Sequence, residues 1–173
     1  MLVQGGQFNK ESWEKQAQAL TASGFRVLAF DLRGYGQSHG PDEARRFDVL
    51  AAVHYMRKTG ARTVAVVGAS MGGDTPRKQP RPNGASIDRL VLLAAGAYTP
   101  LIRSKARTLF ILSRDDVMGE NTPRLPQIRA QFEKASVRKE LVILEGSAHA
   151  QAIFATDQGE RLMREILRFL SAP

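Results

Sequence analysis

The strongest constraint on the fold is a short apolar run that leads directly into a serine flanked by glycines. Residues 63–67 are rich in β-branched side chains and almost wholly apolar, which is typical of a central strand buried on both faces of a parallel sheet. Residues 68–73, Gly-Ala-Ser-Met-Gly-Gly, follow at once. Glycines two positions before and after Ser70 let the backbone pass close to itself. The sequence therefore predicts a strand, a sharp turn and a helix, with the Ser70 hydroxyl raised above the sheet.

The rest of the chain alternates strand-like and helix-like segments. Strands are predicted over residues 1–3, 25–30, 90–94, 108–112 and 140–144, and helices over residues 9–23, 41–59, 123–135 and 157–170. We therefore expect an α/β fold, with a mainly parallel sheet of about six strands, helices on both faces and right-handed crossovers. No internal repeat or domain boundary is visible, so residues 1–173 are expected to form a single domain.

Composition excludes several classes of protein. The 173 residues include no cysteine, which rules out a disulfide scaffold, a cysteine-ligated zinc site and a thiol nucleophile. The three histidines, His39, His54 and His149, are far apart in the sequence, so no metal is expected, and no cofactor is expected either. Hydrophobic residues make up 43% of the chain and charged residues 24%, as in an ordinary globular domain.

The charge balance is basic without indicating a nucleic-acid partner. Lys and Arg number 25 against 17 Asp and Glu, for a net charge of +8. The cations are scattered rather than gathered in one run, and only one Trp and three Tyr are available to stack on bases. No apolar run reaches the roughly 18 residues of a membrane span, and the N-terminus lacks the pattern of a signal peptide. We expect a cytoplasmic protein that binds neither nucleic acid nor membrane.

A serine nucleophile needs a base and an orienting acid, and both are available downstream. The carboxylate pair Asp115-Asp116 follows one predicted strand closely, and His149 lies in the loop beyond another. Ligands and reactive groups of such sheets lie beyond the carboxyl ends of the strands. The sequence therefore predicts that Ser70, one of the two aspartates and His149 come together at that edge of the sheet.

With these motifs in place, the sequence resembles the α/β-hydrolase family over nearly the whole chain. Residues 68–73 resemble the family's nucleophile elbow. Residues 31–38, Asp-Leu-Arg-Gly-Tyr-Gly-Gln-Ser, resemble the loop after its fourth strand. Residues 4–7, Gln-Gly-Gly-Gln, are similar to the oxyanion loop after its third strand, with Gln4 in place of the usual histidine.

The resemblance implies a catalytic triad. Ser70 would attack an acyl carbon, His149 would take its proton and return it to the leaving group, and Asp116 would orient the imidazole. The family pattern is often Gly-x-x-Asp after the strand, and Ser113 stands at the glycine position. Asp116 is therefore the expected acid, and Asp115 is the alternative.

The resemblance also implies an oxyanion hole. Its donors would be the backbone N–H of Met71 and that of Gly6 or Gln7. Position 4 does not itself supply this backbone N–H, so Gln4 in place of the usual histidine does not abolish the oxyanion hole.

The sequence departs from the family at its start and between two strands. In full-length members two more strands come before the third strand, which residues 1–3 resemble. Those two have no counterpart here, so the chain is expected to be either a naturally minimal hydrolase or a fragment of a longer one. The expected strand order is 4-3-5-6-7-8 in the family's numbering, with residues 25–30 as an exposed edge. Only residues 95–107 stand where the family often inserts a lid, so we expect no separate lid domain and an open site that favours small or promiscuous esters.

Residues 74–84 interrupt the helix that the family has after its nucleophile. They contain three prolines and three cations, and each proline inside a helix costs about 3 kcal/mol. Three explanations are open: a native loop after one short helical turn, an introduced change, or a shifted reading frame restored near Ile87. A native loop there predicts lower stability and mobility beside Ser70.

The expected function is that of a serine hydrolase of esterase type, which cleaves small carboxylic esters through an acyl-enzyme intermediate. A thioesterase or lactonase with the same triad is an alternative, and so is a catalytically inactive hydrolase-fold binding protein. His39 is a candidate to line the mouth of the site, His54 is expected on a helix for packing or at the surface, and Asp31 is expected to be structural. The oligomeric state is not predicted.

Overall fold

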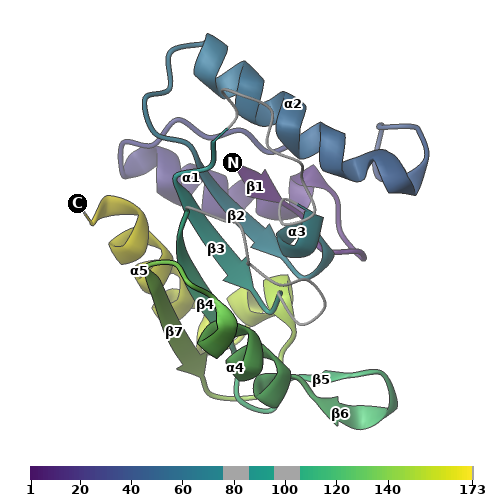
Figure 1. Cartoon of the computed structure of the whole chain (residues 1–173), viewed down its shortest axis with the longest axis vertical. Coiled ribbons are helices and arrows are strands. Elements are labelled where there is room, and N and C mark those ends of the chain that lie inside the picture. Colours follow the sequence, from purple (N-terminus) through teal and green to yellow (C-terminus); the bar gives the residue numbers. More distant parts are fainter. Residues whose placement is uncertain (76–85, 96–105, 173) are drawn as a thin grey trace.

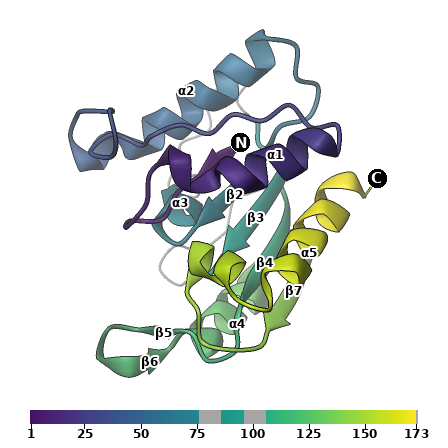
Figure 2. The same ribbon diagram turned by 180° about the vertical axis from the view of Figure 1, so that it is seen from behind.

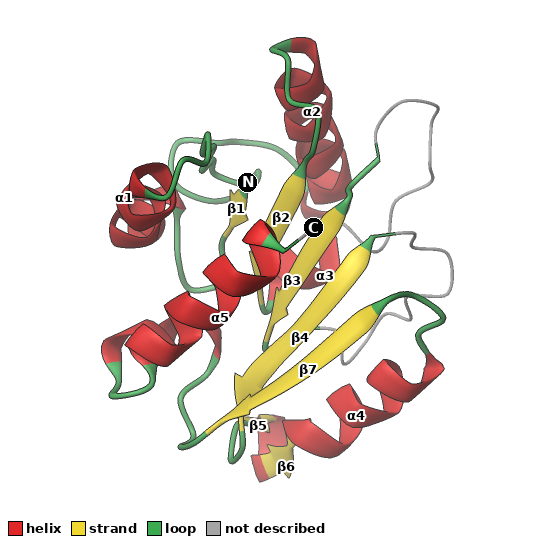
Figure 3. Ribbon diagram, turned by 90° about the vertical axis from the view of Figure 1, so that its left-hand side faces the viewer, coloured by secondary structure: helices red, strands yellow, loops and turns green. Residues whose placement is uncertain are grey.

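The computed structural model of the chain describes residues 1–75, 86–95 and 106–172. Over these residues a parallel sheet lies between two layers of helices (Figure 1, Figure 3). The strand order is β1-β2-β3-β4-β7, and every neighbouring pair is parallel. The strands are β1 Leu2–Val3, β2 Ala65–Ala69, β3 Arg89–Leu93, β4 Arg107–Ser113 and β7 Lys139–Leu144. The predicted α/β class and mainly parallel sheet are confirmed.

The helices divide between the two faces of the sheet. α1 and α5 cover one face, and α2, α3 and α4 cover the other, as the front and back views show (Figure 1, Figure 2). Their bounds are α1 Glu14–Ala22, α2 Arg45–Lys58, α3 Met71–Asp74, α4 Arg124–Lys134 and α5 Gly159–Ser171. The 3-10 turns η1 Lys10–Trp13 and η2 Asp42–Ala44 precede α1 and α2, so the first two predicted helices each begin more tightly wound than an α-helix.

A short hairpin and a 3-10 helix lie beyond the ends of β4 and β7. A two-stranded antiparallel hairpin, β5 Val117–Met118 and β6 Thr122–Pro123, separates β4 from α4 and has the 3-10 turn η4 Gly119–Asn121 at its tip. The 3-10 helix η5 Ala150–Ala155 follows β7 and leads towards α5. These elements carry the chain across the carboxyl edge of the sheet.

The core lies where the central strands meet the helices. Val91 of β3 pairs with Leu109 of β4, and both side chains are fully buried. Leu162, Ile166 and Phe169 of α5 are buried at helical spacing, so this helix lays one apolar face on the sheet. Burial on both faces explains why the central strands are nearly continuous apolar runs in the sequence.

The prediction of a sixth strand over residues 25–30 is wrong. This segment joins the sheet only through an isolated parallel bridge between Leu2 and Ala29, and the Leu2 N–H donates to Leu28 O at 2.9 Å. Its partner β1 is two residues long and ends where the chain turns into Gly5 and Gly6, so few backbone groups are left to pair with it. The bridge still lies beside β1, and the five strands that form follow the predicted order.

Two expectations concern residues that lie largely outside the described part of the chain. Of residues 74–84, only Asp74 and Thr75 are described, at the end of α3. Of residues 95–107, where no lid was expected, residues 96–105 lie outside. Within the described ranges, no helix combines the length and apolar character that a membrane span requires.

The turn between β2 and α3 brings backbone segments unusually close together. A Cβ atom on Gly72 would lie 2.4 Å from Gln4 O and 2.5 Å from Val3 O. A Cβ on Gly68 would lie 2.5 Å from the Cα of Gly73. Because these neighbours are backbone atoms, they cannot rotate away, and any side chain would push α3 off β1 and β2.

We expect Gly72→Ala to lower the free energy of unfolding by about 1–3 kcal/mol through overpacking against β1. The matched control is Gly119→Ala, because a Cβ there meets no atom within 4 Å. Urea denaturation of both variants measures the effect. Equal stability of the two variants would contradict the close approach of α3 to β1.

Candidate active site

Ser70 occupies a strained turn at the carboxyl end of β2. Its φ of 49° and ψ of −119° lie in a region that residues with a side chain rarely adopt, at a cost on the order of 1–3 kcal/mol. Two hydrogen bonds hold the turn: the Ser70 N–H donates to Leu93 O at 2.8 Å, and the Gly73 N–H donates to Ser70 O at 3.0 Å. The first bond ties the turn to β3. The strained strand-to-helix turn read from the glycine pattern is therefore present.

The three residues singled out in the sequence lie within hydrogen-bonding distance of one another. His149 Nε2 is 2.9 Å from Ser70 Oγ, and His149 Nδ1 is 2.8 Å from Asp116 Oδ2. Ser70 follows β2, Asp116 lies beyond β4, and His149 lies beyond β7. The parallel sheet brings these three strand ends to one edge, which is why residues 79 positions apart in the sequence meet.

The two candidate aspartates differ sharply in their surroundings. Asp116 is buried, with a relative exposure of 1%, whereas Asp115 is exposed. The Asp115 backbone N–H donates to Gly146 O at 3.0 Å, which ties its loop to that of His149. Among the described residues, the carboxylate at hydrogen-bonding distance from His149 is that of Asp116. The geometry favours Asp116, as the motif position did.

Ser113 ties the end of β4 to the histidine loop. Its side chain is buried, and its hydroxyl donates to Ala148 O at 2.7 Å, one residue before His149. In the sequence, Ser113 was noted only because it occupies the glycine position of the Gly-x-x-Asp pattern. Its hydroxyl contact was not predicted, because it depends on which loop lies beside the strand end.

Arg124 is a second neighbour of Asp116, and a positively charged one, that sequence reasoning missed. Its Nε lies 3.1 Å from Asp116 Oδ2, and only 10% of its side chain is exposed. Its backbone N–H also donates to Asp116 O at 2.9 Å. The β5–β6 hairpin returns the chain to Asp116, and strands of two residues leave almost no periodic signal in a sequence.

The loop that the resemblance associates with the oxyanion hole lies directly beside Ser70. A Cβ on Gly5 would lie 3.6 Å from Ser70 Cβ and 3.5 Å from Ala69 O. Gly6 and Gln7 are exposed on the same loop, and Met71 opens α3 just after Ser70. The loop that carries Gly6 and Gln7 thus begins beside the serine, and the donor role of its backbone N–H groups stays a prediction.

Gln4 and Gln151 hold this loop from its two sides. With its amide oriented to match its neighbours, the buried Gln4 donates to Phe30 O at 3.1 Å and accepts from Leu32 N–H at 3.2 Å. The Gly5 N–H donates to Gln151 Oε1 at 2.7 Å in a buried contact. Because Gln151 comes two residues after His149, its side chain connects the loop of the base to residues 4–7. Its contact was not predicted, since nothing in the sequence distinguishes it from other glutamines.

The Gln151 amide also reaches a second segment near the N-terminus. Its Nε2 donates to Ser12 Oγ at 2.7 Å, and Ser12 Oγ donates to Asn9 O at 2.5 Å. Both ends of the Gln151 amide are therefore used, one by the loop beside Ser70 and one by η1.

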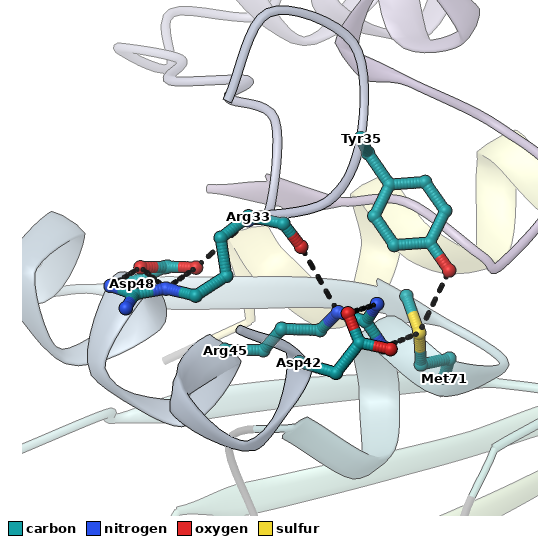
Figure 4. A network of polar contacts seen from close by, with 6 residues as sticks. All are labelled: Arg33, Tyr35, Asp42, Arg45, Asp48 and Met71. Atoms are coloured by element: carbon teal, nitrogen blue, oxygen red, sulfur yellow. Dashed lines mark hydrogen bonds and ion pairs between the residues drawn. The ribbon is translucent and has the colours of Figure 1, made fainter. Parts of the chain in front are cut away.

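A third loop contacts the residue that follows the serine (Figure 4). The Tyr35 hydroxyl donates to Met71 Sδ at 3.5 Å, and Arg45 Nη1 donates to the same sulfur at 3.4 Å. The Arg45 guanidinium also lies over the Tyr35 ring, 4.8 Å from its centroid, and pairs with Asp42. The Tyr35 hydroxyl is 3.6 Å from the position that a Cβ on Gly6 would take. Tyr35 therefore lies beside both Met71 and Gly6, which flank the predicted oxyanion hole, and the start of α2 contacts Met71.

The loop that carries Tyr35 is anchored by two carboxylates. Asp48 pairs with Arg33 and accepts from its backbone N–H at 3.0 Å. Asp31 accepts from both the backbone N–H and the Nζ of Lys10, each at 2.8 Å. Burial alone would raise the pKa of Asp31, but the hydrogen bonds from Lys10 and Gln37 lower the pKa overall. The contacts of Asp31 are structural, as the sequence suggested.

The remaining histidines lie at the surface. His54 is exposed on α2, and His39 is exposed in the loop before η2. Neither contributes a hydrogen bond to the arrangement around Ser70 among the described residues. In the same part of the chain, no group of three or more His, Asp or Glu side chains is placed to hold a metal ion.

Comparison with known proteins connects this geometry to one family. A family model described as alpha/beta hydrolase fold matches residues 1–108. The AB hydrolase superfamily protein YisY of Bacillus subtilis is 37% identical over 102 residues, which cover 56% of this chain and 37% of that protein. The non-heme haloperoxidase of Rhodococcus erythropolis is 33% identical over 108 residues, which cover 59% and 38% respectively. The match thus spans little more than a third of the length of these curated relatives.

Solved structures of the same fold match almost the whole chain. The monoacylglycerol lipase of Paleococcus ferrophilus has a TM-score of 0.80 at 18% identity, over 98% of this chain and 92% of that one. A thermophilic esterase from Thermogutta terrifontis has a TM-score of 0.73 at 17% identity, over 98% and 88%. At this level of identity the likeness concerns the fold.

We expect Gln151→Leu to lower the free energy of unfolding by about 1–3 kcal/mol, because it leaves the buried Gly5 N–H without an acceptor. The control is Gln18→Leu on α1, where the glutamine is exposed and we expect a change within about 0.5 kcal/mol. Urea denaturation compares them. A Gln151→Leu protein no less stable than the control would show that the bridge contributes nothing.

Proposed function

Because this chain belongs to the alpha/beta hydrolase fold family, we propose that it is a serine hydrolase that cleaves small carboxylic esters through an acyl-enzyme intermediate. The observation that carries the proposal is the unbroken series of contacts from Ser70 Oγ through the His149 imidazole to Asp116 Oδ2. Nucleophile, base and orienting acid in this geometry define the Ser-His-Asp arrangement on unrelated folds as well.

In the proposed acylation step, Ser70 Oγ attacks the ester carbonyl carbon while its proton passes to His149 Nε2. The imidazolium then protonates the alkoxide as the bond to the leaving alcohol breaks. In the deacylation step, water is the nucleophile and Ser70 Oγ is the leaving group. His149 takes a proton from the water, the hydroxide attacks the acyl carbon, and Ser70 Oγ leaves with a proton from the imidazolium. Each half-reaction returns His149 to its neutral form.

Asp116 is placed to act on the base, His149, rather than on the substrate. Its carboxylate is buried and faces His149 Nδ1, so it fixes the tautomer that leaves Nε2 free to accept the serine proton. It also stabilises the positive charge that the ring gains in the transition state.

The tetrahedral intermediate places a negative charge on the former carbonyl oxygen. The proposed donors are the backbone N–H of Met71 and that of Gly6 or Gln7. The strained turn at Ser70 and the bridge from Gln151 to Gly5 fix these two segments before substrate arrives, so little reorganisation is required in the transition state.

Two observations favour acyl transfer as the reaction: the nucleophile is a hydroxyl, and several proteins with a similar fold are named as ester-cleaving enzymes. A hydroxyl activated by histidine suits attack on a carbonyl carbon, whereas attack on an alkyl carbon calls for a carboxylate. Two of the similar solved structures bear the names of an esterase and a monoacylglycerol lipase. A thioesterase or lactonase would use the same three residues, and a substrate screen separates these leaving groups.

We expect a fluorophosphonate probe to form one covalent adduct on the peptide that contains Ser70. The adduct forms because His149 removes the hydroxyl proton, so Ser70→Ala should abolish it and His149→Ala should slow it by about 10³-fold or more. Intact-mass and peptide mapping measure the adduct.

The same samples should hydrolyse a short-chain nitrophenyl ester, and this turnover should disappear in Ser70→Ala. A folded parent protein that forms no adduct and shows no turnover would overturn the proposal in favour of a catalytically inactive binding protein. Circular dichroism of each variant establishes that it is folded.

We expect Asp116→Asn to lower kcat by roughly 10³–10⁴-fold, because an amide favours the wrong imidazole tautomer. Asp115→Asn is the matched control, since it changes the neighbouring, exposed carboxylate and should leave kcat within about twofold. Ester hydrolysis at saturating substrate measures both. Equal losses in the two variants would exclude Asp116 as the orienting acid.

A further inference from the structure

The carboxylate that faces the imidazole has a second neighbour, a guanidinium, at the same oxygen atom. Asp116 Oδ2 lies 2.8 Å from His149 Nδ1 and 3.1 Å from Arg124 Nε. The exposed fractions of the Asp116 and Arg124 side chains are 1% and 10%, so water screens this contact only weakly. The triad mechanism requires the imidazole contact and makes no use of the guanidinium.

The fold fixes Arg124 in this place through its backbone. The β5–β6 hairpin, closed by the pairs Val117–Pro123 and Met118–Thr122, reverses the chain directly after Asp116. Arg124 then opens α4, and its backbone N–H donates to Asp116 O at 2.9 Å. Because the backbone bond does not depend on the side chain, a substitution at position 124 changes the charge beside the carboxylate without removing this anchor.

We propose that Arg124 is a positioning residue that acts through Asp116: its charge keeps the carboxylate ionised and partly offsets it, so that His149 stays neutral and able to accept a proton at lower pH. This inference rests on the proposed function, because it concerns the base of the same site. In this proposal Arg124 does not touch the substrate; it sets the pH below which activity is lost.

The sign of the effect follows from electrostatics. A fixed positive charge a few ångströms from the Asp116–His149 pair opposes the addition of a proton to that pair. Removing the charge makes protonation easier, whichever of the two groups binds the proton. The base is then lost at a higher pH, and the acid limb of the activity profile moves upward.

Other charged residues lie on the loops and helices around the site. They are Arg114 and Asp115 after β4, Glu120 in η4, Arg129 on α4, Glu145 after β7, Asp74 on α3 and Arg45 on α2. Arg114 pairs with Glu145 where both are exposed. Among the described residues, the charged groups in contact with the Asp116 carboxylate are Arg124 and, when protonated, His149.

The test compares neutral and charged substitutions at position 124 with a matched control. Arg124→Gln removes the charge and keeps a polar side chain, and Arg124→Met removes it with an apolar side chain suited to a buried position. Arg124→Lys keeps the charge. Arg129→Gln removes an exposed charge from the same helix. Thermal unfolding identifies which variants are folded, and either neutral variant suffices.

The first measurement is the pH titration of the His149 ring by NMR, which needs no activity. The chain has three histidines, so a His149→Asn spectrum assigns the resonance. We expect the midpoint to rise by about one pH unit in Arg124→Gln and Arg124→Met, and to stay near the parent value in Arg124→Lys and Arg129→Gln. The acid limb of kcat/KM for ester hydrolysis should move by the same amount in the same variants.

The outcomes separate this inference from the proposed function. An unchanged midpoint in a folded neutral variant would overturn the role of Arg124, even where probe labelling of Ser70 is normal. A lower kcat with no shift of the acid limb would also overturn it, because it would indicate packing alone. Absence of labelling and turnover in the parent would instead overturn the proposed function, while the titration would still decide whether Arg124 governs the protonation of His149.

Discussion

The hydrogen bond from the Ser70 N–H to Leu93 O is the contact on which the candidate site depends. It fixes the end of β2 against β3 at the point where the backbone enters an unfavourable conformation. The glycines at 68, 72 and 73 then allow α3 to begin almost in contact with β1. A strained backbone conformation of this kind persists only where contacts with the surrounding structure hold it in place. The sheet supplies that support, because β2 lies between two paired neighbours.

Around this turn, contacts between loops set the positions of the other groups. Ser113 holds the chain just before His149, and Gln151 holds the chain just after it. Tyr35 and Arg45 hold Met71 from the side of α2. Each contact joins a loop to a different strand end, so the geometry of the imidazole is defined by the sheet as a whole rather than by one loop. This is the arrangement that preorganised catalytic groups require.

The parts of the fold that the sequence predicted are those with local or periodic signals. The buried runs gave the parallel strands within about two residues, and the glycine pattern gave the turn at Ser70. The grouping of Ser70, Asp116 and His149 was predictable because parallel strands share one carboxyl edge. It needed no knowledge of side-chain contacts.

The parts that failed, or were not anticipated, depend on distant partners. Residues 25–30 have the composition of a strand, but pairing needs a neighbour of adequate length, and β1 offers two residues. Arg124 and Gln151 have ordinary sequence surroundings, and their importance arises from a short hairpin and from a 3-10 helix that fold back on the site. No local pattern encodes such returns.

The hydrogen bond between Gly5 and Gln151 also affects the stage of folding at which the site forms. Its two residues are 146 positions apart, and Ser12 and Gln151 are 139 apart, whereas Ser70 and His149 are separated by 79. Closing such long loops costs entropy before any contact compensates for it. The central strands can pair first, but the loop beside Ser70 is held in place only when Gly5 and Gln151 meet. We therefore expect a partly folded molecule to contain the central strands and the serine turn before the candidate site is complete.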